Sequence, residues 1–342
     1  MPRLERGDRI AIISPSSGLA PSFPGVYERG LDALRSLGLE PVELPTARMT
    51  SEELYKNPRA RAIDLKNSLR RDDIQGVISV IGGYESIRLF EHLRPSDFAH
   101  RPTFLMGGSD ATTYLLFARR AGVIGFYGPS IMAGLSQTDD LPEEFRRHIE
   151  SFLFESWSEY EYASFPSFTH GYTGWNAKDP GGIGKLHPAG DGWNVLQGEA
   201  PVEGHLWGGC IEVVEFLKGT RYWPPASFFD EAVLFFETSE EKPPPDRVGY
   251  MLRNYGVAGI IGRASALLLG RPKDYTAADV ERLHATVRSI VADEFARPDL
   301  PVVTNVDFGH TDPKMILPIG GRVRVDPVLK RITLLESPFT DR

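Results

Sequence analysis

The sequence predicts an α/β protein, with an N-terminal domain built on a mostly parallel, doubly wound sheet and a smaller C-terminal α/β domain with a β-rich end. The chain has 342 residues, which corresponds to two domains at roughly 150 residues each. Hydrophobic residues make up 41% and charged residues 25% of the chain, as in ordinary globular proteins. Short apolar runs alternate with amphipathic stretches, which is the pattern of βαβ units.

The first half of the chain shows this alternation clearly. Residues 9–14 form an apolar run that ends at Pro15, which is typical of a buried strand followed by a turn. Apolar residues have helical spacing in 61–71, and the β-branched run that follows ends at two glycines. We expect strands at 9–14, 40–44, 76–81, 103–106 and 123–127, and helices at 26–37, 61–71, 86–93, 111–121 and 143–154.

Periodicity is lost over residues 156–204, where aromatic residues, Gly and Pro gather around Trp157, Trp175 and Trp193. Irregular segments of this length are usually binding loops or disordered connectors, and the aromatic content disfavours disorder. We therefore expect an active-site loop and linker at 156–204, between an N-terminal domain at 1–155 and a C-terminal domain at 205–342.

The α/β pattern returns in the C-terminal domain. The strongly apolar stretch at 232–237 predicts a buried strand, and the amphipathic stretch at 277–295 predicts a long helix. We expect helices at 209–217, 247–255 and 277–295, strands at 232–237 and 302–306, an apolar run at 264–269, and β-structure over 315–335.

Charge and cysteine content argue against several classes of function. The net charge is −8 and no stretch gathers Lys and Arg as a phosphate-binding patch does, so no nucleic-acid polymer is expected as a partner. Cys210 is the single cysteine, and residues 1–9 are too charged for a signal peptide, so we expect a cytoplasmic protein. No apolar run is long enough to predict a membrane span.

A serine stands at a strand-to-helix junction in Gly107-Gly108-Ser109-Asp110. Such a serine is lifted out of the sheet, and the helix that follows offers backbone N–H groups to a developing oxyanion, so Ser109 is a candidate nucleophile. The alternative is that Ser109 or Asp110 caps the helix. Ala111 replaces the last glycine of the G-x-S-x-G pattern, which disfavours an ordinary α/β-hydrolase.

A nucleophilic serine needs a base and a carboxylate that orients the base. His310 lies just past an apolar strand and is the best placed of the eight histidines. Glu237 ends another apolar strand, where it requires a partner; the alternative to an orienting role is a salt bridge, for instance to Arg247. Glu240 and Glu241 have the pattern of solvent-exposed acids.

Two glycines, Gly82 and Gly83, follow the strand predicted at 76–81. They let the backbone approach a substrate and donate an N–H to an oxyanion, or they simply form a tight turn. The chain has no H-E-x-x-H and no C-x-x-C motif, and its Gly-rich stretch at 181–185 lacks the spacing of a phosphate loop. We expect neither a metal nor a nucleotide cofactor.

Seven short motifs follow one another along the chain. They are GDRIAIISPS at 7–16, Gly82-Gly83-Tyr84, Gly108-Ser109-Asp110, Tyr127-Gly128-Pro129, GHLWGG at 204–209, LFFE at 234–237 and Gly309-His310-Thr311. Each is short, but together they cover nearly the whole chain and form a specific set. In order and spacing they resemble the LD-carboxypeptidase family of serine peptidases.

This resemblance implies a role for each matching residue. Ser109 would be the nucleophile, His310 the general base, and Glu237 the residue that orients it. The backbone N–H groups of Asp110 and Gly83 would form the oxyanion hole. The resemblance also implies a parallel-sheet N-terminal domain, metal-free activity in the cytoplasm, and a homodimer.

Two branches of the family imply different substrates. One cleaves the bond between an L- and a D-amino acid in murein tetrapeptides during peptidoglycan recycling. The other resembles the microcin C self-immunity peptidase, which cleaves the amide between a peptidyl or aminoacyl carboxyl group and a modified nucleotide. The segments around Trp175 and Trp193 resemble this second branch, in which loop tryptophans cover the substrate. Packing of both tryptophans onto the body of the protein is the alternative.

We expect a serine peptidase or amidase that acts on a peptidyl or aminoacyl-nucleotide bound by Gly82, Trp175 and Trp193. The alternatives are a murein LD-carboxypeptidase and a non-catalytic protein that sequesters its ligand. Ile81 stands where many murein-cleaving members carry Arg, and Cys210 where members often carry Asn. Cys210 opens an apolar helix, so we expect it to be buried and inert.

Overall fold

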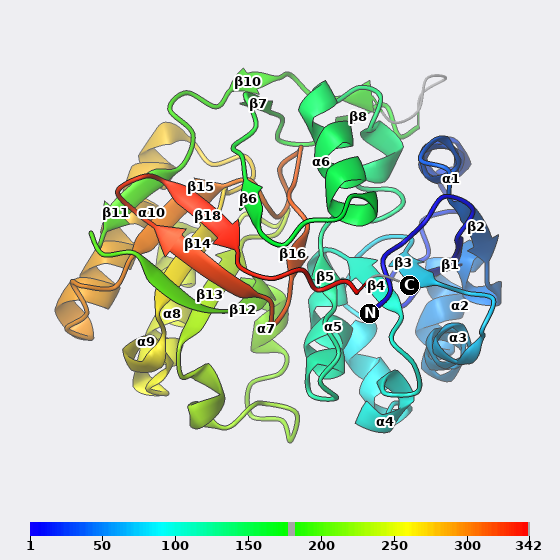
Figure 1. The fold of residues 1–342 in the computed structure, drawn as a ribbon, viewed down its shortest axis with the longest axis horizontal. Coiled ribbons are helices and arrows are strands. Elements are labelled where there is room, and N and C mark those ends of the chain that lie inside the picture. The colour runs from blue at the N-terminus through cyan, green and yellow to red at the C-terminus, as the bar shows by residue number, and fades with distance from the viewer. Residues whose placement is uncertain (177–181, 341–342) are drawn as a thin grey trace.

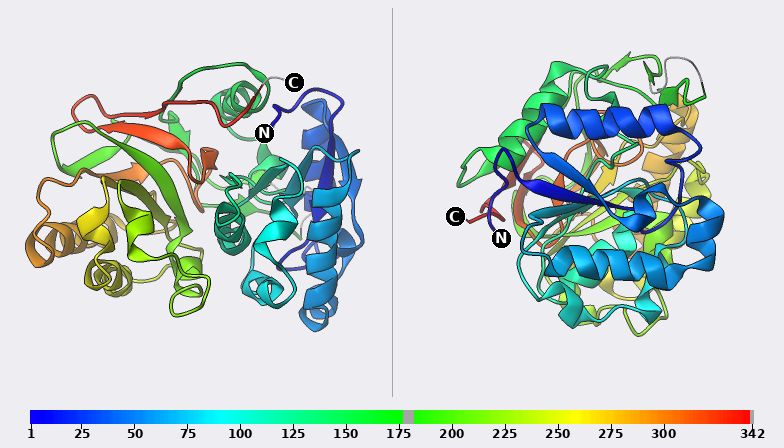
Figure 2. Two further views of the ribbon diagram at one scale, coloured as in Figure 1. Left: turned by 60° about the horizontal axis from the view of Figure 1, so that its bottom comes forward. Right: turned by 90° about the vertical axis from the view of Figure 1, so that its right-hand side faces the viewer.

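Two β-sheets lie side by side in the computed structural model, which describes residues 1–176 and 182–340 (Figure 1). The N-terminal part of the chain forms most of the first sheet and the C-terminal part most of the second, with helices packed beside both (Figure 2). The predicted α/β class, with a largely parallel N-terminal sheet and a β-rich C-terminal end, is confirmed.

The first sheet is built from alternating strands and helices. Its elements are β1 (Arg9–Ile13), α1 (Pro24–Ser36), β2 (Glu40–Glu43), α2 (Ser51–Lys56), α3 (Pro58–Arg70), β3 (Gly76–Ser79), α4 (Pro95–Phe98), β4 (Phe104–Gly107), α5 (Thr112–Arg119), β5 (Phe126–Tyr127) and α6 (Glu143–Phe154), joined by β16 (Leu317–Pro318). The strand order is β16-β5-β4-β3-β1-β2, and β16 is antiparallel to β5. Every residue of β3 and β4 is buried, as in a parallel sheet covered on both faces.

The second sheet has a parallel centre and antiparallel edges. Its elements are β6 (Tyr160–Tyr162), β11 (Asn194–Gln197), β12 (Val202–Cys210), α7 (Ile211–Glu215), β13 (Ala232–Glu237), α8 (Pro245–Val257), α9 (Ile260–Arg263), β14 (Ala266–Gly270), α10 (Ala277–Arg288), β15 (Val302–Val306), β17 (Arg322–Asp326) and β18 (Arg331–Leu334). The strand order is β11-β15-β14-β13-β12-β17-β18-β6, and the strands from β15 to β12 run parallel.

The segment predicted as a loop at 156–204 contains short strands. β6 and β11 complete the two edges of the second sheet. Two further pairs are antiparallel: β7 (Ser167–Phe168) with β10 (His187–Pro188), and β8 (Tyr172–Thr173) with β9 (Gly182–Ile183). Strands of two to four residues are too short to leave a periodic pattern in the sequence.

Strand β12 was not expected. Its last two residues fall within the helix predicted at 209–217, and that helix begins only at Ile211. Glycines interrupt the β pattern of this strand. A Cβ atom at Gly204 would collide with the carbonyl oxygen of Glu231, and one at Gly208 with that of Phe235, so β13 passes too close for larger side chains. The other departures are local: 86–91 is a 3₁₀-helix, and α10 ends in a π-helical turn at 289–294.

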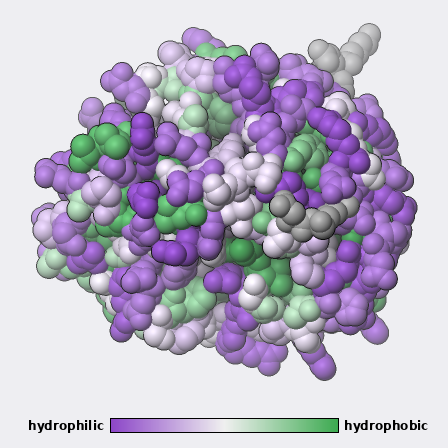
Figure 3. Space-filling model, in the orientation of Figure 1, coloured by the Kyte–Doolittle hydropathy of each residue, from purple (hydrophilic) through white to green (hydrophobic). Residues whose placement is uncertain are grey.

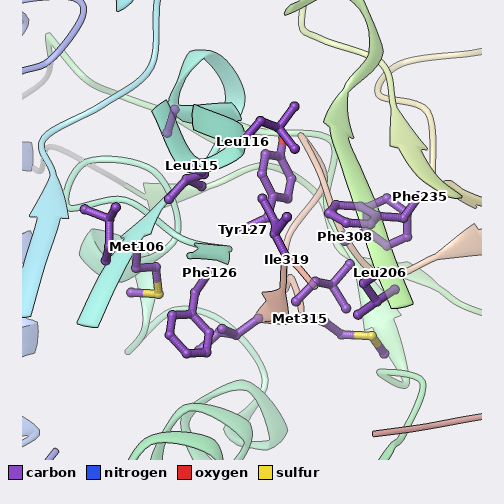
Figure 4. Packing of buried hydrophobic residues seen from close by; sticks show 14 of the residues in the cluster. Met106, Leu115, Leu116, Phe126, Tyr127, Leu206, Phe235, Phe308, Met315 and Ile319 are labelled. Carbon is purple, nitrogen blue, oxygen red and sulfur yellow. The ribbon is translucent and has the colours of Figure 1, made fainter. Parts of the chain in front are cut away.

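One continuous hydrophobic core joins the two sheets (Figure 4). The ring of Tyr127 at the end of β5 lies 5.9 Å from that of Phe235 on β13. Phe235 in turn packs edge-on against Phe308 at 5.7 Å. The two sheets are therefore fixed relative to each other by buried side chains as well as by the crossing strand β16.

The face of the molecule in Figure 3 is mainly hydrophilic and carries only small hydrophobic patches. Large exposed hydrophobic residues such as Tyr55, Val257 and Val328 lie on different elements. Within residues 1–176 and 182–340, no helix has both the length and the hydropathy needed to span a bilayer.

Candidate active site

The carboxyl ends of parallel strands bring the predicted site residues together from both sheets. Gly82 and Gly83 follow β3, Ser109 follows β4, Glu237 ends β13, and His310 follows β15. This is the edge at which open α/β sheets bind ligands. All of these residues except Glu237 line one cavity.

Ser109 lies on a strained turn. Its φ of 56° is in the left-handed region, which costs a residue with a side chain roughly 1–2 kcal/mol. The backbone N–H of Ser109 donates to the Tyr127 hydroxyl at 3.0 Å, and its carbonyl accepts from the Thr112 hydroxyl at 2.7 Å. These two bonds hold the turn in place, and strain of this kind is typical of functional sites.

The carboxylate of Asp110 anchors the same turn from inside the first sheet. It is fully buried and accepts hydrogen bonds from the Ser16 hydroxyl and from the Ser86 N–H, the latter at 2.8 Å. Burial raises the pKa of the Asp110 carboxyl. Neither the 3₁₀-helix at Ser109–Ala111 nor helix α5, which follows it, has a side-chain cap at its start. The capping alternative therefore does not describe this turn.

His310 is held by the acid that ends the neighbouring strand. Its Nδ1 lies 2.7 Å from Oε2 of Glu237, and Oε1 of Glu237 accepts a 2.5 Å hydrogen bond from the Tyr127 hydroxyl. Glu237 is buried, and these two bonds supply the partners that a buried carboxylate requires. They take the place of the salt bridge to Arg247, which is exposed.

The second ring nitrogen of His310 faces Glu240. Nε2 lies 2.9 Å from Oε2 of Glu240, so Glu240 is exposed as expected and also pairs with His310, which was not expected. Burial alone would lower the pKa of His310, but the carboxylates of Glu237 and Glu240 raise it to about 10. The hydrogen bond from His310 lowers the pKa of Glu240 to about 2. The two carboxylates together therefore favour the protonated form of His310.

The glycine turn after β3 packs against Ser109. A Cβ atom at Gly82 would lie 2.7 Å from Cβ and 2.9 Å from Oγ of Ser109. Gly83 has a φ of 145°, and a Cβ there would collide with the hydroxyls of Ser16 and Ser17. Both positions therefore require glycine, and Gly82 packs directly against Ser109.

Two cavities meet at Ser109. The cavity of about 450 Å³, here called the aromatic cavity, is lined among others by Ile81, Tyr172, Trp175, Lys273 and Lys314. The cavity of about 570 Å³, here called the acidic cavity, is lined among others by Glu212, Glu215, Glu241 and Arg247. Gly83, Tyr84, Ser109 and Glu240 line both.

The two predicted loop tryptophans lie in different surroundings. Trp175 lines the aromatic cavity, with its ring 5.2 Å from that of Phe23 and 5.9 Å from that of Tyr172. Trp193 is 3% exposed, donates its Nε1–H to Asp307 at 2.8 Å, and lines neither cavity. The packing alternative therefore describes Trp193, while substrate contact remains a prediction for Trp175.

Sequence reasoning gave no role to Tyr127 or to the contact of Glu240 with His310. Tyr127 opens the Tyr-Gly-Pro motif at the end of β5, and that position was the available signal. Glu240 is followed by Glu241, and nothing in the sequence separates the two. Cys210 is buried, and burial raises the pKa of its thiol, as expected of an inert cysteine. Among the described residues, no three His, Cys, Asp or Glu side chains form a metal-binding group.

Comparisons with known proteins identify the relatives of the chain. The model of the LD-carboxypeptidase N-terminal domain matches residues 10–128, and that of the LD-carboxypeptidase C-terminal domain matches residues 203–325. A Vibrio cholerae protein that carries a carboxypeptidase name is 25% identical over 324 residues, which is 94% of this chain and 93% of that protein. The microcin C7 self-immunity protein MccF of Escherichia coli is 24% identical over 338 residues, covering 97% and 94%.

Solved structures of relatives have the same fold. MccF in complex with glutamyl sulfamoyl guanosine superposes with a TM-score of 0.85 at 22% identity and covers 99% of both chains. An MccF-like protein from Streptococcus pneumoniae in complex with AMP gives a TM-score of 0.84 at 27% identity, covering 95% of this chain and 98% of that one. Since the two domain models together match most of the sequence, the chain belongs to the LD-carboxypeptidase family of serine peptidases.

Proposed function

We propose that the protein is a serine hydrolase in which Ser109 is the nucleophile, His310 the general base, and Glu237 the residue that orients His310. The observation that carries this proposal is one cavity lined by both Ser109 and His310, with Nδ1 of His310 bonded to a buried carboxylate. A nucleophile and a base that is oriented by a third group are the parts that acyl transfer requires.

In the acylation step, Oγ of Ser109 attacks the carbonyl carbon of the substrate amide while Nε2 of His310 takes the hydroxyl proton. The oxyanion is stabilised by the backbone N–H groups of Gly83 and Asp110, which flank the nucleophile. The C–N bond then breaks, and His310 delivers the proton to the leaving nitrogen. The product of this half-reaction is an ester between the acyl group and Ser109.

In the deacylation step, a water molecule attacks the ester carbonyl carbon and gives its proton to Nε2 of His310. The C–O bond to Ser109 breaks, the proton returns to Oγ, and a free carboxylic acid leaves. The same base and the same oxyanion donors serve both steps, so no cofactor enters the reaction.

We propose an aminoacyl or peptidyl nucleotide analogue as the substrate class. The aromatic cavity supports this proposal because its Trp175 and Tyr172 offer flat surfaces beside the nucleophile, and Lys273 and Lys314 provide cationic groups for the linkage to the ribose. MccF and the Streptococcus pneumoniae protein were crystallised with an aminoacyl sulfamoyl nucleoside and with AMP, respectively. A base stacked in the aromatic cavity would place its acyl group toward the acidic cavity.

The family relationship also favours a second candidate, a murein tetrapeptide LD-carboxypeptidase. The third candidate is a non-catalytic protein that binds and sequesters its ligand. Such a protein would use the same pocket but would need no nucleophile.

Product analysis by mass spectrometry separates these candidates. Wild-type protein and Ser109→Ala are incubated with an aminoacyl sulfamoyl adenosine and, separately, with a murein tetrapeptide. We expect cleavage of the first compound by wild type alone. Release of D-Ala from the tetrapeptide alone would instead assign cell-wall recycling, and binding of the nucleotide conjugate by both proteins without cleavage would assign sequestration.

We also infer a cytoplasmic homodimer, as the resemblance to the family implies. Light scattering coupled to size-exclusion chromatography tests the dimer, and a mass near 38.0 kDa would contradict it.

A further inference from the structure

The ring of His310 is engaged at both nitrogens. Nδ1 contacts Glu237 at 2.7 Å and Nε2 contacts Glu240 at 2.9 Å. The proposed reaction uses Nε2 to take the proton of Ser109, so Glu240 and Ser109 compete for the same ring nitrogen. Glu240 has to release His310 before the base can act.

Glu240 lies where a substrate would reach it. Its side chain is 50% exposed, whereas that of Glu237 is fully buried. It lines both cavities together with Ser109. The acidic cavity is lined by Glu212, Glu215 and Glu241 as well as Glu240, against one cation, Arg247.

We propose that Glu240 binds an ammonium group on the acyl part of the substrate, and that its transfer from His310 to this ammonium frees Nε2 for Ser109. This inference rests on the proposed function. An aminoacyl amide carries its α-ammonium only two bonds from the scissile carbonyl carbon. When that carbon lies at Oγ of Ser109, the ammonium lies in the region that Ser109 and Glu240 line together. Its three N–H donors form strong charge-assisted bonds with a carboxylate.

The exchange keeps the charge of the site constant. Before binding, one imidazolium stands between two carboxylates, and the group carries one net negative charge. After binding, the substrate ammonium supplies the positive charge, so His310 can lose its proton and become a base. The opposing carboxylates hold the pKa of His310 far above that of a useful base as long as no such cation is present.

Three substrates test the inference. They are alanyl sulfamoyl adenosine, its N-acetyl derivative, and N-acetyl-lysyl sulfamoyl adenosine, which moves the ammonium to the end of the side chain. In wild type we expect kcat/KM for the free amine to exceed that for N-acetyl-alanyl by roughly tenfold to a hundredfold, the range of one charge-assisted hydrogen bond. The lysyl compound shows whether an ammonium on the side chain serves equally well.

Glu240→Gln should bring the preference for an ammonium close to one. The rate with the free amine falls, whereas the rate with N-acetyl-alanyl rises because His310 is no longer held at Nε2. A damaged site would lower both rates, so the N-acetyl substrate reports on folding within the same experiment. The matched control is Glu281→Gln, which removes the same charge from the exposed face of α10, outside both cavities, and should keep the wild-type preference.

Two failures can be told apart. Cleavage of all three compounds by wild type without preference, or a preference that Glu240→Gln leaves intact, would overturn the role of Glu240 and leave the serine hydrolase in place. If none of the compounds is cleaved in a Ser109-dependent manner, the proposed function falls and the inference with it.

Discussion

The two sheets contribute to the site in different ways: the first supplies a shaped backbone and the second supplies charged side chains. In the first sheet, Ser109 is presented by a left-handed turn against two obligatory glycines, with Asp110 buried beneath it. In the second sheet, His310 is positioned by electrostatic contacts, and one of these partners is half-exposed. The proposed nucleophile therefore depends on backbone geometry, whereas the proposed base depends on its contacts with two carboxylates.

The largest expected loss of activity comes from changing Ser109 of the first sheet and His310 of the second, singly and together, in a double-mutant cycle. Ser109→Ala and His310→Ala should each lower kcat/KM by roughly 10³ to 10⁶-fold. The kcat/KM of the double variant should be no lower than that of the less active single variant, because the two residues act as one unit. Steady-state kinetics with an aminoacyl sulfamoyl adenosine gives all three values. Losses that multiply would show that the two sheets contribute independently.

A smaller loss is expected for Glu237, which we propose only orients the base. Glu237→Gln keeps the shape of the side chain but removes the charge opposite His310, and kcat should fall by roughly 10² to 10⁴-fold, less than in Ser109→Ala. The pKa of His310 should fall as well, which an NMR titration of the imidazole can follow. Equal losses in kcat for the two variants would contradict the orienting role.

Tyr127→Phe tests the hydrogen-bonded connection between Ser109 in the first sheet and Glu237 in the second. The Tyr127 hydroxyl accepts from the Ser109 N–H and donates to Glu237, and it lines neither cavity. We expect kcat to fall roughly tenfold to a hundredfold while KM changes little, because no substrate contact is lost.

Tyr162→Phe is the control for this effect. Its hydroxyl donates to the carbonyl of Ile316 at 2.7 Å, so this change also deletes one buried hydrogen bond. It should lower the free energy of unfolding by about 1 kcal/mol and leave kcat unchanged. A similar fall in kcat in both variants would mean that Tyr127 acts only through stability.

The smallest effect concerns stability. The pKa of His310 is about 10 in the folded protein, against 6.5 ordinarily, so its contribution to stability is complete below pH 6.5 and is lost as the pH rises through about 10. The difference in Tm between wild type and His310→Gln should therefore shrink by on the order of a few °C between pH 6 and pH 10. A constant difference over this range would show that folded His310 is not held protonated.

The sequence predicted best what depends on local pattern. The β-branched run before Gly82 and the apolar run before Glu237 identified two strands, and the polar residues after such runs are the ones that the structure brings together. Strand β12 escaped because its glycines are needed for a close approach by β13, which is a tertiary requirement. The position of Glu240 and the second bond of Tyr127, which joins residues 110 positions apart, depend on how the two sheets pack together, and no local pattern encodes them.

The exchange of edge strands between the sheets has a consequence for cutting the chain. Residues 199–201 are exposed between β11 and β12. A protease nick there would leave β6 and β11 on the N-terminal fragment, although both belong to the second sheet, and β16 on the C-terminal fragment, although it pairs with β5. Each fragment would then hold edges of the other's sheet, so the pieces should stay associated. A chain divided at this point could serve as a split enzyme, whose hydrolysis appears only when the two pieces meet.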